Sequence, residues 1–300
     1  MATDNDFEDW ALMYTMNQID GVLYLGGIAA TKKVDDLRRA NITTILSVIS
    51  DKIPREDRIS GITYYWVQAD DAEDEDLLTW FPEMYDIIDR CVVSGTGILV
   101  HCAAGISRSS TTVCSYLMKK RQNTYEQIVQ FVRSRRPIID PNPGFVAQLE
   151  LWQEMGYRLD ANSHRFRQYM REIYFQRFPF KMKKYFSRLT AAENMTQPLN
   201  LGQQYVCKKC GERLFHELHV LKRSGDAIKG TCGYVFIDPQ PWMSELNGSQ
   251  PILDRSSDQP IRCQKCKQQV AKCWTTPSAY QCPCIDHSGF KQIRVQMLDN

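Results

Sequence analysis

The chain has 300 residues, of which 43% are hydrophobic; this is enough for a sizeable core and fits two modest domains better than one. Its 37 basic and 35 acidic residues give a formal net charge of +2, so the overall charge indicates neither nucleic-acid nor membrane binding. The sequence has no apolar run of the roughly 18 residues that a membrane-spanning helix needs, and the acidic start MATDNDFEDW lacks the pattern of a secretory signal. We therefore expect a chain with no membrane partner that works in the cytoplasm and nucleus.

Residues 18–157 are predicted to form one domain in which strands and helices alternate. Apolar and β-branched runs predict strands at 21–27, 42–50, 62–69 and 97–102. Amphipathic spacing predicts helices at 32–41, 77–92, 110–121, 124–136 and 143–156. This alternation is typical of an α/β fold with a mainly parallel central sheet flanked by helices.

The composition changes after residue 157. Residues 158–200 are basic and aromatic without a strand pattern, which predicts one or two linker helices. Such a mixture also occurs in segments that contact RNA, but a solvated helix with an apolar face packed on a neighbour is the favoured interpretation. Residues 201–300 alternate short β-like pieces with cysteine, glycine and proline, and are predicted to form a small β-rich domain stapled by zinc.

The strongest functional signal is the loop VHCAAGISRSS at residues 100–110, which lies between a predicted strand and a predicted helix. In that setting the loop N–H groups can turn inward around one centre, and the helix points its positive N-terminus at the same place. A thiol at that centre, Cys102, ionises readily and becomes a nucleophile, and the planar guanidinium of Arg108 can hold two phosphate oxygens. The residues predicted to bind substrate are Ala103, Ala104, Gly105, Ile106, Ser107 and Arg108.

The predicted chemistry is attack of the Cys102 thiolate on phosphorus, which gives a phosphocysteine intermediate. Ser109 is predicted to donate a hydrogen bond to the sulfur and help it leave in the second step. His101 is predicted to brace the loop by hydrogen bonding without touching substrate.

Residues 20–156 resemble the protein tyrosine phosphatase superfamily, and specifically its compact dual-specificity branch. The resemblance is carried by IDGVLYLGG, HCAAGISRSS and IIDPNPGFVAQL. It implies that Cys102 is the nucleophile, Arg108 the phosphate clamp and Ser109 the hydroxyl that eases breakdown of the intermediate, with no metal needed for catalysis. The loop lacks the lysines of phosphoinositide-directed relatives and the histidine and asparagine of RNA-capping triphosphatase relatives, so a phosphoprotein substrate is expected.

The leaving oxygen needs a proton, and the acidic stretch DDAEDED at residues 70–76 follows a predicted strand. In the branch that the chain resembles, the acid is followed by five residues and then Leu or Ile, often with an aromatic residue four positions further on. Asp71 fits this pattern with Leu77 and Phe81, whereas Asp70 misses it by one residue. Asp71 is therefore the expected general acid.

Eight of the eleven cysteines lie in the last third of the chain, where two C-x-x-C pairs are typical of zinc knuckles. We predict two structural zinc ions. One site is expected to contain Cys263, Cys266, Cys282 and Cys284. The other is expected to contain Cys207, Cys210, Cys232 and a fourth ligand, for which His216, His219 and Cys273 are the candidates.

With this tail the chain resembles the subfamily of dual-specificity phosphatases that carry a C-terminal zinc-binding domain. The resemblance implies a link to late assembly of the large ribosomal subunit through that domain. The sequence thus predicts a phosphatase for phosphotyrosine and for phosphoserine or phosphothreonine. The alternative is a factor that acts mainly by binding a pre-ribosome or another RNA–protein partner.

Overall fold

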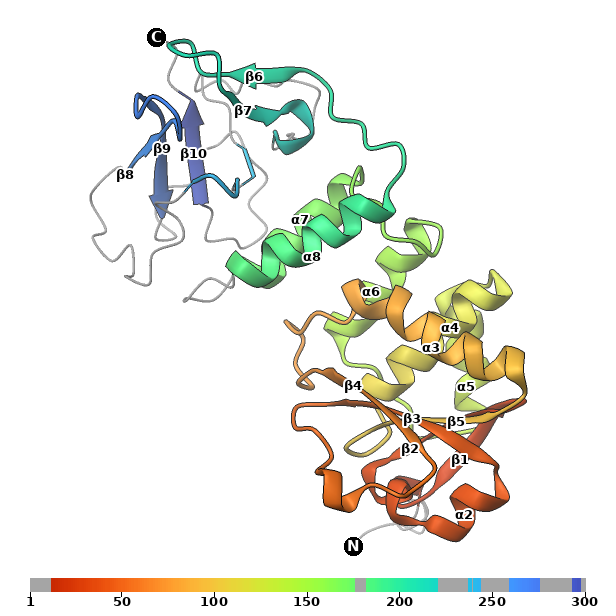
Figure 1. The fold of residues 1–300 in the computed structure, drawn as a ribbon. Helices are drawn as coiled ribbons and strands as arrows, with labels where there is room; N and C mark the ends of the chain where they lie inside the picture. Colours follow the sequence, from red (N-terminus) through yellow and green to blue (C-terminus); the bar gives the residue numbers. More distant parts are fainter. Residues whose placement is uncertain are drawn as a thin grey trace, which may run out of the picture. The chain divides into compact units, whose positions relative to one another are not determined.

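The computed structural model describes residues 12–175, 182–220, 237–238, 240–243, 259–275 and 293–297 of the chain. The chain divides into two compact units, Met1–Leu159 and Asp160–Asn300, each described below by itself (Figure 1). Within these described ranges, no helix combines the length and the apolar character that crossing a membrane requires.

The first unit is built on a five-stranded sheet in the order β1-β2-β5-β3-β4. Its strands are β1 (Met16–Asp20), β2 (Leu23–Gly27), β3 (Ile42–Ile49), β4 (Thr63–Gln68) and β5 (Gly97–Cys102). The last four pair in parallel, whereas β1 is an antiparallel edge strand beside β2. The predicted mainly parallel sheet is confirmed, and β1 is an addition to the predicted strands.

Helices cover both faces of this sheet (Figure 1). On one face lie α3 (Phe81–Ser94), α4 (Arg108–Arg121), α5 (Tyr125–Arg133) and α6 (Pro143–Glu154). On the other lies α2 (Val34–Arg39), preceded by the 3₁₀ turn η1 (Ile28–Lys32). Two further 3₁₀ turns, η2 (Arg55–Asp57) and η3 (Leu78–Trp80), lie in the connections around β4. The α/β class predicted for this part of the chain is therefore correct.

The starts of two helices follow from their capping residues. Thr124 accepts a hydrogen bond from the Gln127 N–H, and the Gln127 side chain accepts from the Thr124 N–H, which completes a capping box at the start of α5. Asn142 caps α6, and Pro143 occupies the first helical position, where its missing N–H costs nothing.

Strand β5 positions the candidate site. Every residue of GILVHC is buried, because β5 lies between β2 and β3 at the centre of the sheet. Its carboxyl end is Cys102, and α4 begins six residues later at Arg108. The intervening loop therefore lies at the carboxyl edge of the parallel strands, where ligands of α/β proteins usually bind.

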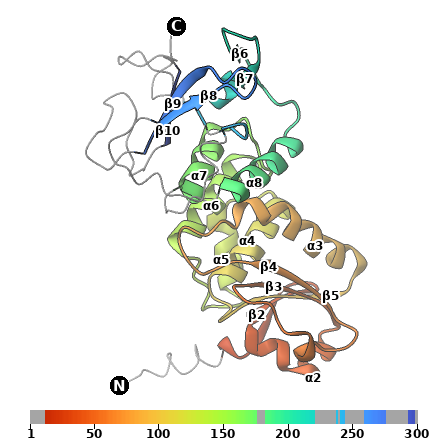
Figure 2. The same cartoon turned by 60° about the vertical axis from the view of Figure 1, so that its left-hand side comes forward.

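The second unit begins with two helices, α7 (His164–Phe175) and α8 (Met182–Met195), which pack side by side (Figure 2). Their aromatic residues face inward: Phe166, Tyr174 and Tyr185 are at most 1% exposed. The buried guanidinium of Arg167 bonds Glu193 at 2.7 Å and Asp238 at 3.4 Å. The apolar face of these helices is thus packed within the unit, as the favoured interpretation expected.

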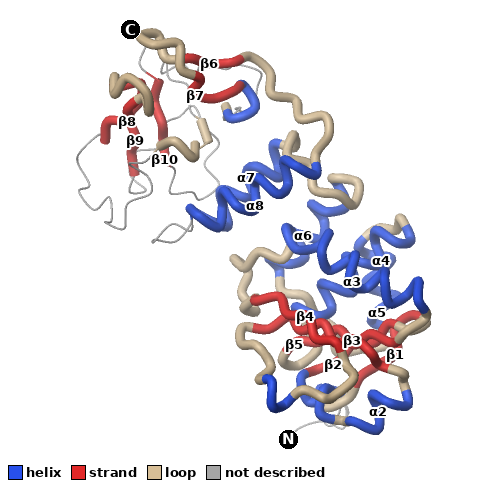
Figure 3. The backbone as a smooth tube through the Cα atoms, in the orientation of Figure 1, coloured by secondary structure: helices blue, strands red, loops and turns tan. Residues whose placement is uncertain are grey.

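Beyond these helices, the described residues of the second unit form short strands and turns (Figure 3). A two-stranded sheet contains β6 (Gln204–Val206) and β7 (Arg213–His216), followed by the 3₁₀ turn η4 (Glu217–His219). A three-stranded antiparallel sheet contains β8 (Gln259–Arg262), β9 (Gln269–Thr275) and β10 (Ile293–Met297). This is the β-rich, cysteine-bearing region that the sequence predicts.

Candidate active site and metal centre

The sulfur of Cys102 lies at the centre of the loop between β5 and α4. It accepts hydrogen bonds from the Gly105 N–H at 3.3 Å and from the Ser109 hydroxyl at 3.2 Å. Cys102 is 1% exposed, so both bonds form away from bulk water. Two donors directed at one sulfur are contacts that a thiolate nucleophile can use.

The carbonyl groups of this loop are bound by donors outside it. Those of Ala103 and Ile106 accept from the backbone N–H groups of Ile28 and Asp140, at 2.9 and 3.0 Å. Those of Ala104 and Gly105 accept from the guanidinium of Arg136, at 3.0 and 2.8 Å. Because the N–H of a peptide unit points away from its carbonyl, the N–H groups of residues 104–107 turn toward the loop centre. The loop is therefore built as an anion-binding nest.

Arg136 is a functional residue that the sequence analysis missed. It is completely buried, and besides the two loop carbonyls its guanidinium donates to Asn17 Oδ1 at 2.6 Å. Burial lowers the pKa of Arg136 to about 10, and the nearby Cys102 opposes this shift. The pairing of an arginine three residues beyond the end of α5 with carbonyls 31 and 32 residues away leaves no local pattern in the sequence.

Gly105 is required for two reasons. Its φ is +74°, in the left-handed region that side chains disfavour. A Cβ at this position would also lie 2.5 Å from the carbonyl carbon of Gly26 and 2.6 Å from the Arg136 guanidinium. Close packing and backbone conformation thus both require glycine at this position.

His101 braces the loop from inside the sheet. It is fully buried, with Nδ1 3.1 Å from the Cys102 carbonyl and Nε2 2.7 Å from the Ser47 hydroxyl. Since a carbonyl only accepts, Nδ1 carries the proton and Nε2 accepts from Ser47. Burial, with a smaller contribution from the nearby Arg108, lowers the pKa of His101 to about 4, and the bond to Cys102 opposes this shift. His101 is therefore neutral at physiological pH and makes the bracing contact that the sequence analysis predicts.

Arg108 and Asp71 lie close together beside this loop. Arg108 donates from Nη1 to the Ala69 carbonyl at 3.0 Å, and its Nε lies 3.5 Å from Asp71 Oδ2. That Nε is buried and finds no acceptor in hydrogen-bond geometry within the described part of the chain. The guanidinium is thus held in place while retaining a donor for an oxyanion.

The loop that carries Asp71 is anchored to α6. The Gln148 side chain accepts from the Leu77 and Leu78 N–H groups at 2.9 and 2.8 Å and donates to the Glu75 carbonyl at 2.8 Å. At Gly144 the backbone of the acidic loop comes so close that a Cβ would lie 1.9 Å from the Glu73 carbonyl oxygen. Asp71 is therefore positioned by contacts about 70 residues away in the sequence.

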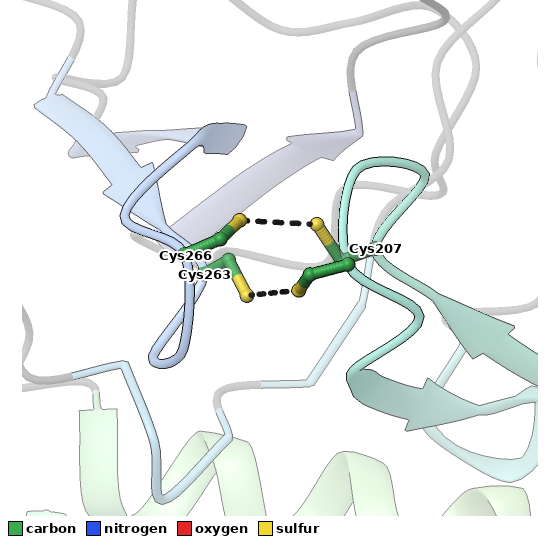
Figure 4. A group of neighbouring side chains, drawn as sticks. Cys207, Cys263 and Cys266 are labelled. Carbon is green, nitrogen blue, oxygen red and sulfur yellow. Dashed lines mark hydrogen bonds between the residues drawn. The ribbon is translucent and has the colours of Figure 1, made fainter.

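The second unit contains a cluster of four cysteines that could hold a metal ion. The sulfurs of Cys207, Cys210, Cys263 and Cys266 all lie within 4.8 Å of one another. The sulfurs of Cys207 and Cys266 are 3.6 Å apart (Figure 4). Those of Cys210 and Cys263 are 3.7 Å apart. Zinc bonded to four thiolates at about 2.3 Å requires sulfurs about 3.8 Å apart, so the set fits a structural zinc ion.

The two cysteine turns have the same backbone geometry. In each, the N–H of the first cysteine donates to a carbonyl five residues on, at 2.8 Å for Cys207 and 2.9 Å for Cys263. In each, the N–H four residues on donates back, from Gly211 at 2.8 Å and from Lys267 at 3.0 Å. Both residues have positive φ, +72° and +60°. Matching turns present two sulfurs each to one centre.

This arrangement corrects the predicted assignment of the zinc ligands. The two C-x-x-C pairs were expected in separate sites, and that grouping is wrong, because the structure joins them in one cluster. His216 and His219 are not part of this cluster, and His219 Nδ1 instead accepts from the His216 N–H at 3.0 Å. The backbone of Cys273 lies in β9. Three predicted ligands lie outside the described residues: Cys232, Cys282 and Cys284.

Comparison with known proteins matches both parts of the chain. Residues 23–155 match the family described as "Dual specificity phosphatase, catalytic domain". Dual specificity protein phosphatase 12 of Mus musculus is 31% identical over 271 residues, which cover 83% of this chain and 78% of the mouse protein. The Homo sapiens protein of that name is 30% identical over 280 residues, with 85% and 80% covered. Among solved structures, the Yvh1 phosphatase domain from Chaetomium thermophilum is 33% identical, with a TM-score of 0.44, and the match covers 47% of this chain and 97% of that one.

Proposed function

Because the chain belongs to the dual specificity phosphatase family, we propose that it hydrolyses phosphotyrosine and phosphoserine or phosphothreonine in proteins through a phosphocysteine intermediate. One observation carries this proposal. A buried sulfur, Cys102, lies inside a loop whose amides turn inward and beside the Arg108 guanidinium, whose Nε–H makes no hydrogen bond among the described residues.

In the first step the Cys102 thiolate attacks phosphorus, forming the S–P bond as the P–O bond to the substrate side chain breaks. The inward N–H groups and Arg108 stabilise the charge on the three equatorial oxygens. Asp71, which lies 3.5 Å from Arg108, gives its proton to the leaving oxygen.

In the second step water attacks the phosphocysteine and gives its proton to the Asp71 carboxylate, the reverse of the first transfer. The S–P bond breaks, and the sulfur leaves as a thiolate. The Ser109 hydroxyl, 3.2 Å from that sulfur, donates the hydrogen bond that stabilises it. No metal takes part in this scheme.

The test compares wild type with Cys102→Ser on a phosphotyrosyl and a phosphoseryl peptide of the same sequence. Wild type is expected to release phosphate from both peptides, and the variant from neither. Release by the variant at the wild-type rate would overturn the proposed nucleophile. Hydrolysis of the phosphotyrosyl peptide alone would overturn the dual specificity.

A second function is proposed for the cysteine-bearing region: binding to a pre-ribosome or another RNA–protein particle. It is supported by four exposed lysines on the two cysteine turns: Lys208, Lys209, Lys265 and Lys267. Cations grouped in this way attract phosphate backbones. Co-sedimentation of the full chain with ribosomal particles is expected to weaken in a Lys209→Glu, Lys265→Glu variant. Unchanged binding would refute the assignment of this surface.

Two further expectations belong with this proposal. We propose two structural zinc ions per chain, one of them in the four-cysteine cluster, which elemental analysis of the purified protein tests directly. We also propose that the protein works in the cytoplasm and nucleus, where thiols stay reduced. Imaging of the tagged full chain in living cells tests this location.

A further inference from the structure

The carboxyl group of Asp71 has two hydrogen-bond donors on one of its oxygens. Oδ1 accepts from the Ser107 hydroxyl at 2.7 Å and from the Asn142 side-chain amide at 3.0 Å. The other oxygen, Oδ2, lies 3.5 Å from Arg108 Nε. The two oxygens therefore have different environments.

The direction of each hydrogen bond to Oδ1 is fixed by its surroundings. Asn142 Oδ1 accepts from the Phe145 N–H at 3.0 Å to cap α6, so the Asn142 NH₂ group must be the end that faces Asp71. The Ser107 oxygen accepts from the Asn142 backbone N–H at 3.2 Å, so its own proton is free to point at Asp71. Both neighbours thus act as donors to Oδ1.

An oxygen that accepts two hydrogen bonds from fixed donors is a poor place for the acid proton. In the neutral form of Asp71 the proton therefore belongs on Oδ2, which lies 3.5 Å from Arg108 Nε and accepts no hydrogen bond from the described residues. Arg108 is the proposed phosphate clamp, so Oδ2 lies beside a residue that binds the phosphate group in the proposed mechanism. The geometry selects the productive one of two protonated forms.

We propose that Ser107 and Asn142 are positioning residues for the general acid, which hold Asp71 by Oδ1 so that Oδ2 carries the proton toward the leaving oxygen. This inference rests on the proposed role of Asp71. Ser107 belongs to the nucleophile loop, and Asn142 begins α6. The hydroxyl of Ser107 therefore fixes the distance between acid and nucleophile, while Gln148 and Gly144 hold the rest of the acidic loop.

The test uses leaving-group dependence, which a merely structural role would not change. Ser107→Ala and Asn142→Ser are assayed on phenyl phosphate, whose leaving group needs a proton, and on p-nitrophenyl phosphate, whose leaving group needs it far less. Serine at position 142 keeps a cap for α6 but is too short to reach Asp71. Each variant is expected to lose about 10- to 100-fold in kcat on phenyl phosphate, within the range of general acid catalysis, and about threefold or less on the activated ester.

Two controls complete the design. Ser107→Thr keeps the hydroxyl and is expected to recover activity on phenyl phosphate. In an Asp71→Asn background, adding Ser107→Ala is expected to cause no further leaving-group-dependent loss, because both changes remove the same function.

If Ser107→Ala and Asn142→Ser lose the same activity on both esters, while Asp71→Asn loses more on phenyl phosphate, the positioning role is overturned and the proposed function stays intact. Absence of leaving-group dependence in Asp71→Asn itself would overturn the assignment of the acid, and the positioning role with it. Circular dichroism of each variant separates loss of folding from loss of proton transfer, and Asn142→Ser tests the proposal if Ser107→Ala does not fold.

Discussion

The neutral, buried His101 makes the stability of the first unit depend on pH in a defined direction. Its pKa in the folded protein is lowered to about 4, mainly by burial, from 6.5 in the unfolded chain. Between these values the unfolded chain binds a proton that the folded chain does not. The contribution of the neutral His101 to stability is therefore fully present above pH 6.5 and is lost as the pH falls toward 4.

The size of this effect follows from the displacement of the pKa. The full difference between 6.5 and about 4 corresponds to about 3 kcal/mol, of which about 2 kcal/mol develops between pH 7 and about pH 4.5. His101→Asn removes the titrating group while its side-chain amide can still donate to the Cys102 carbonyl, as Nδ1 does in the wild type. The variant is expected to be less stable at pH 7, because Ser47 loses its acceptor, but to lose about 2 kcal/mol less on acidification.

The assay must report on the first unit alone, because burial also lowers the pKa of His219 in the second unit to about 4. Native-state hydrogen exchange of the β5 amides gives the free energy of opening at each pH for wild type and His101→Asn. Subtracting the two curves removes the contribution of carboxylates that titrate in the same pH range to the free energy of opening. Parallel curves from pH 7 to about pH 4.5 would refute the buried neutral imidazole.

Arg136→Lys is expected to lower kcat by about tenfold or more, because Arg136 holds two loop carbonyls. The control Arg135→Lys is expected to change kcat little, and steady-state kinetics of both variants tests this. Gly105→Ala is expected to abolish most turnover of an aryl phosphate, whereas Gly95→Ala, at φ +69° with open space around it, should cost only about 1 kcal/mol of unfolding free energy and keep activity. Chelation of zinc is expected to expose the amides of the cysteine-bearing strands to hydrogen exchange while aryl phosphate hydrolysis continues. Lys267→Gly is expected to raise the stability of its turn by about 1 kcal/mol, because φ is +60° there, and thermal unfolding of the zinc-loaded protein should show a higher midpoint.

The sheet and the nucleophile loop could be predicted because their determinants are local. Strand β5 was predicted with the bounds that the structure gives, because GILVHC is a continuous apolar run that ends at the nucleophile loop. Strand β1 was missed because MNQID is mostly polar and becomes a strand through pairing with β2. The β-propensity of a segment therefore does not predict an edge strand that forms only by pairing with its neighbour.

The metal centre and the support of the acid depend on contacts between distant segments. Spacing identified each C-x-x-C pair, but the closeness of Cys207 to Cys266, 59 residues apart, comes only from the folded second unit. In the same way, a helix was predicted at residues 143–156, but the contact of Asn142 with Asp71 requires the packing of α6 against the acidic loop. Local patterns thus give the chemical groups, and tertiary packing gives their partners.

The central claim is that Cys102 carries the phosphoryl group during turnover. Its most direct test is rapid acid quenching of a Ser109→Ala variant with a phosphopeptide, followed by mass spectrometry, since loss of the hydroxyl beside the sulfur should slow breakdown of the intermediate. The account predicts one added phosphoryl group on the peptide that contains Cys102, and none after Cys102→Ser. Turnover that leaves this cysteine unmodified, or a phosphoryl group found on another residue, would contradict it.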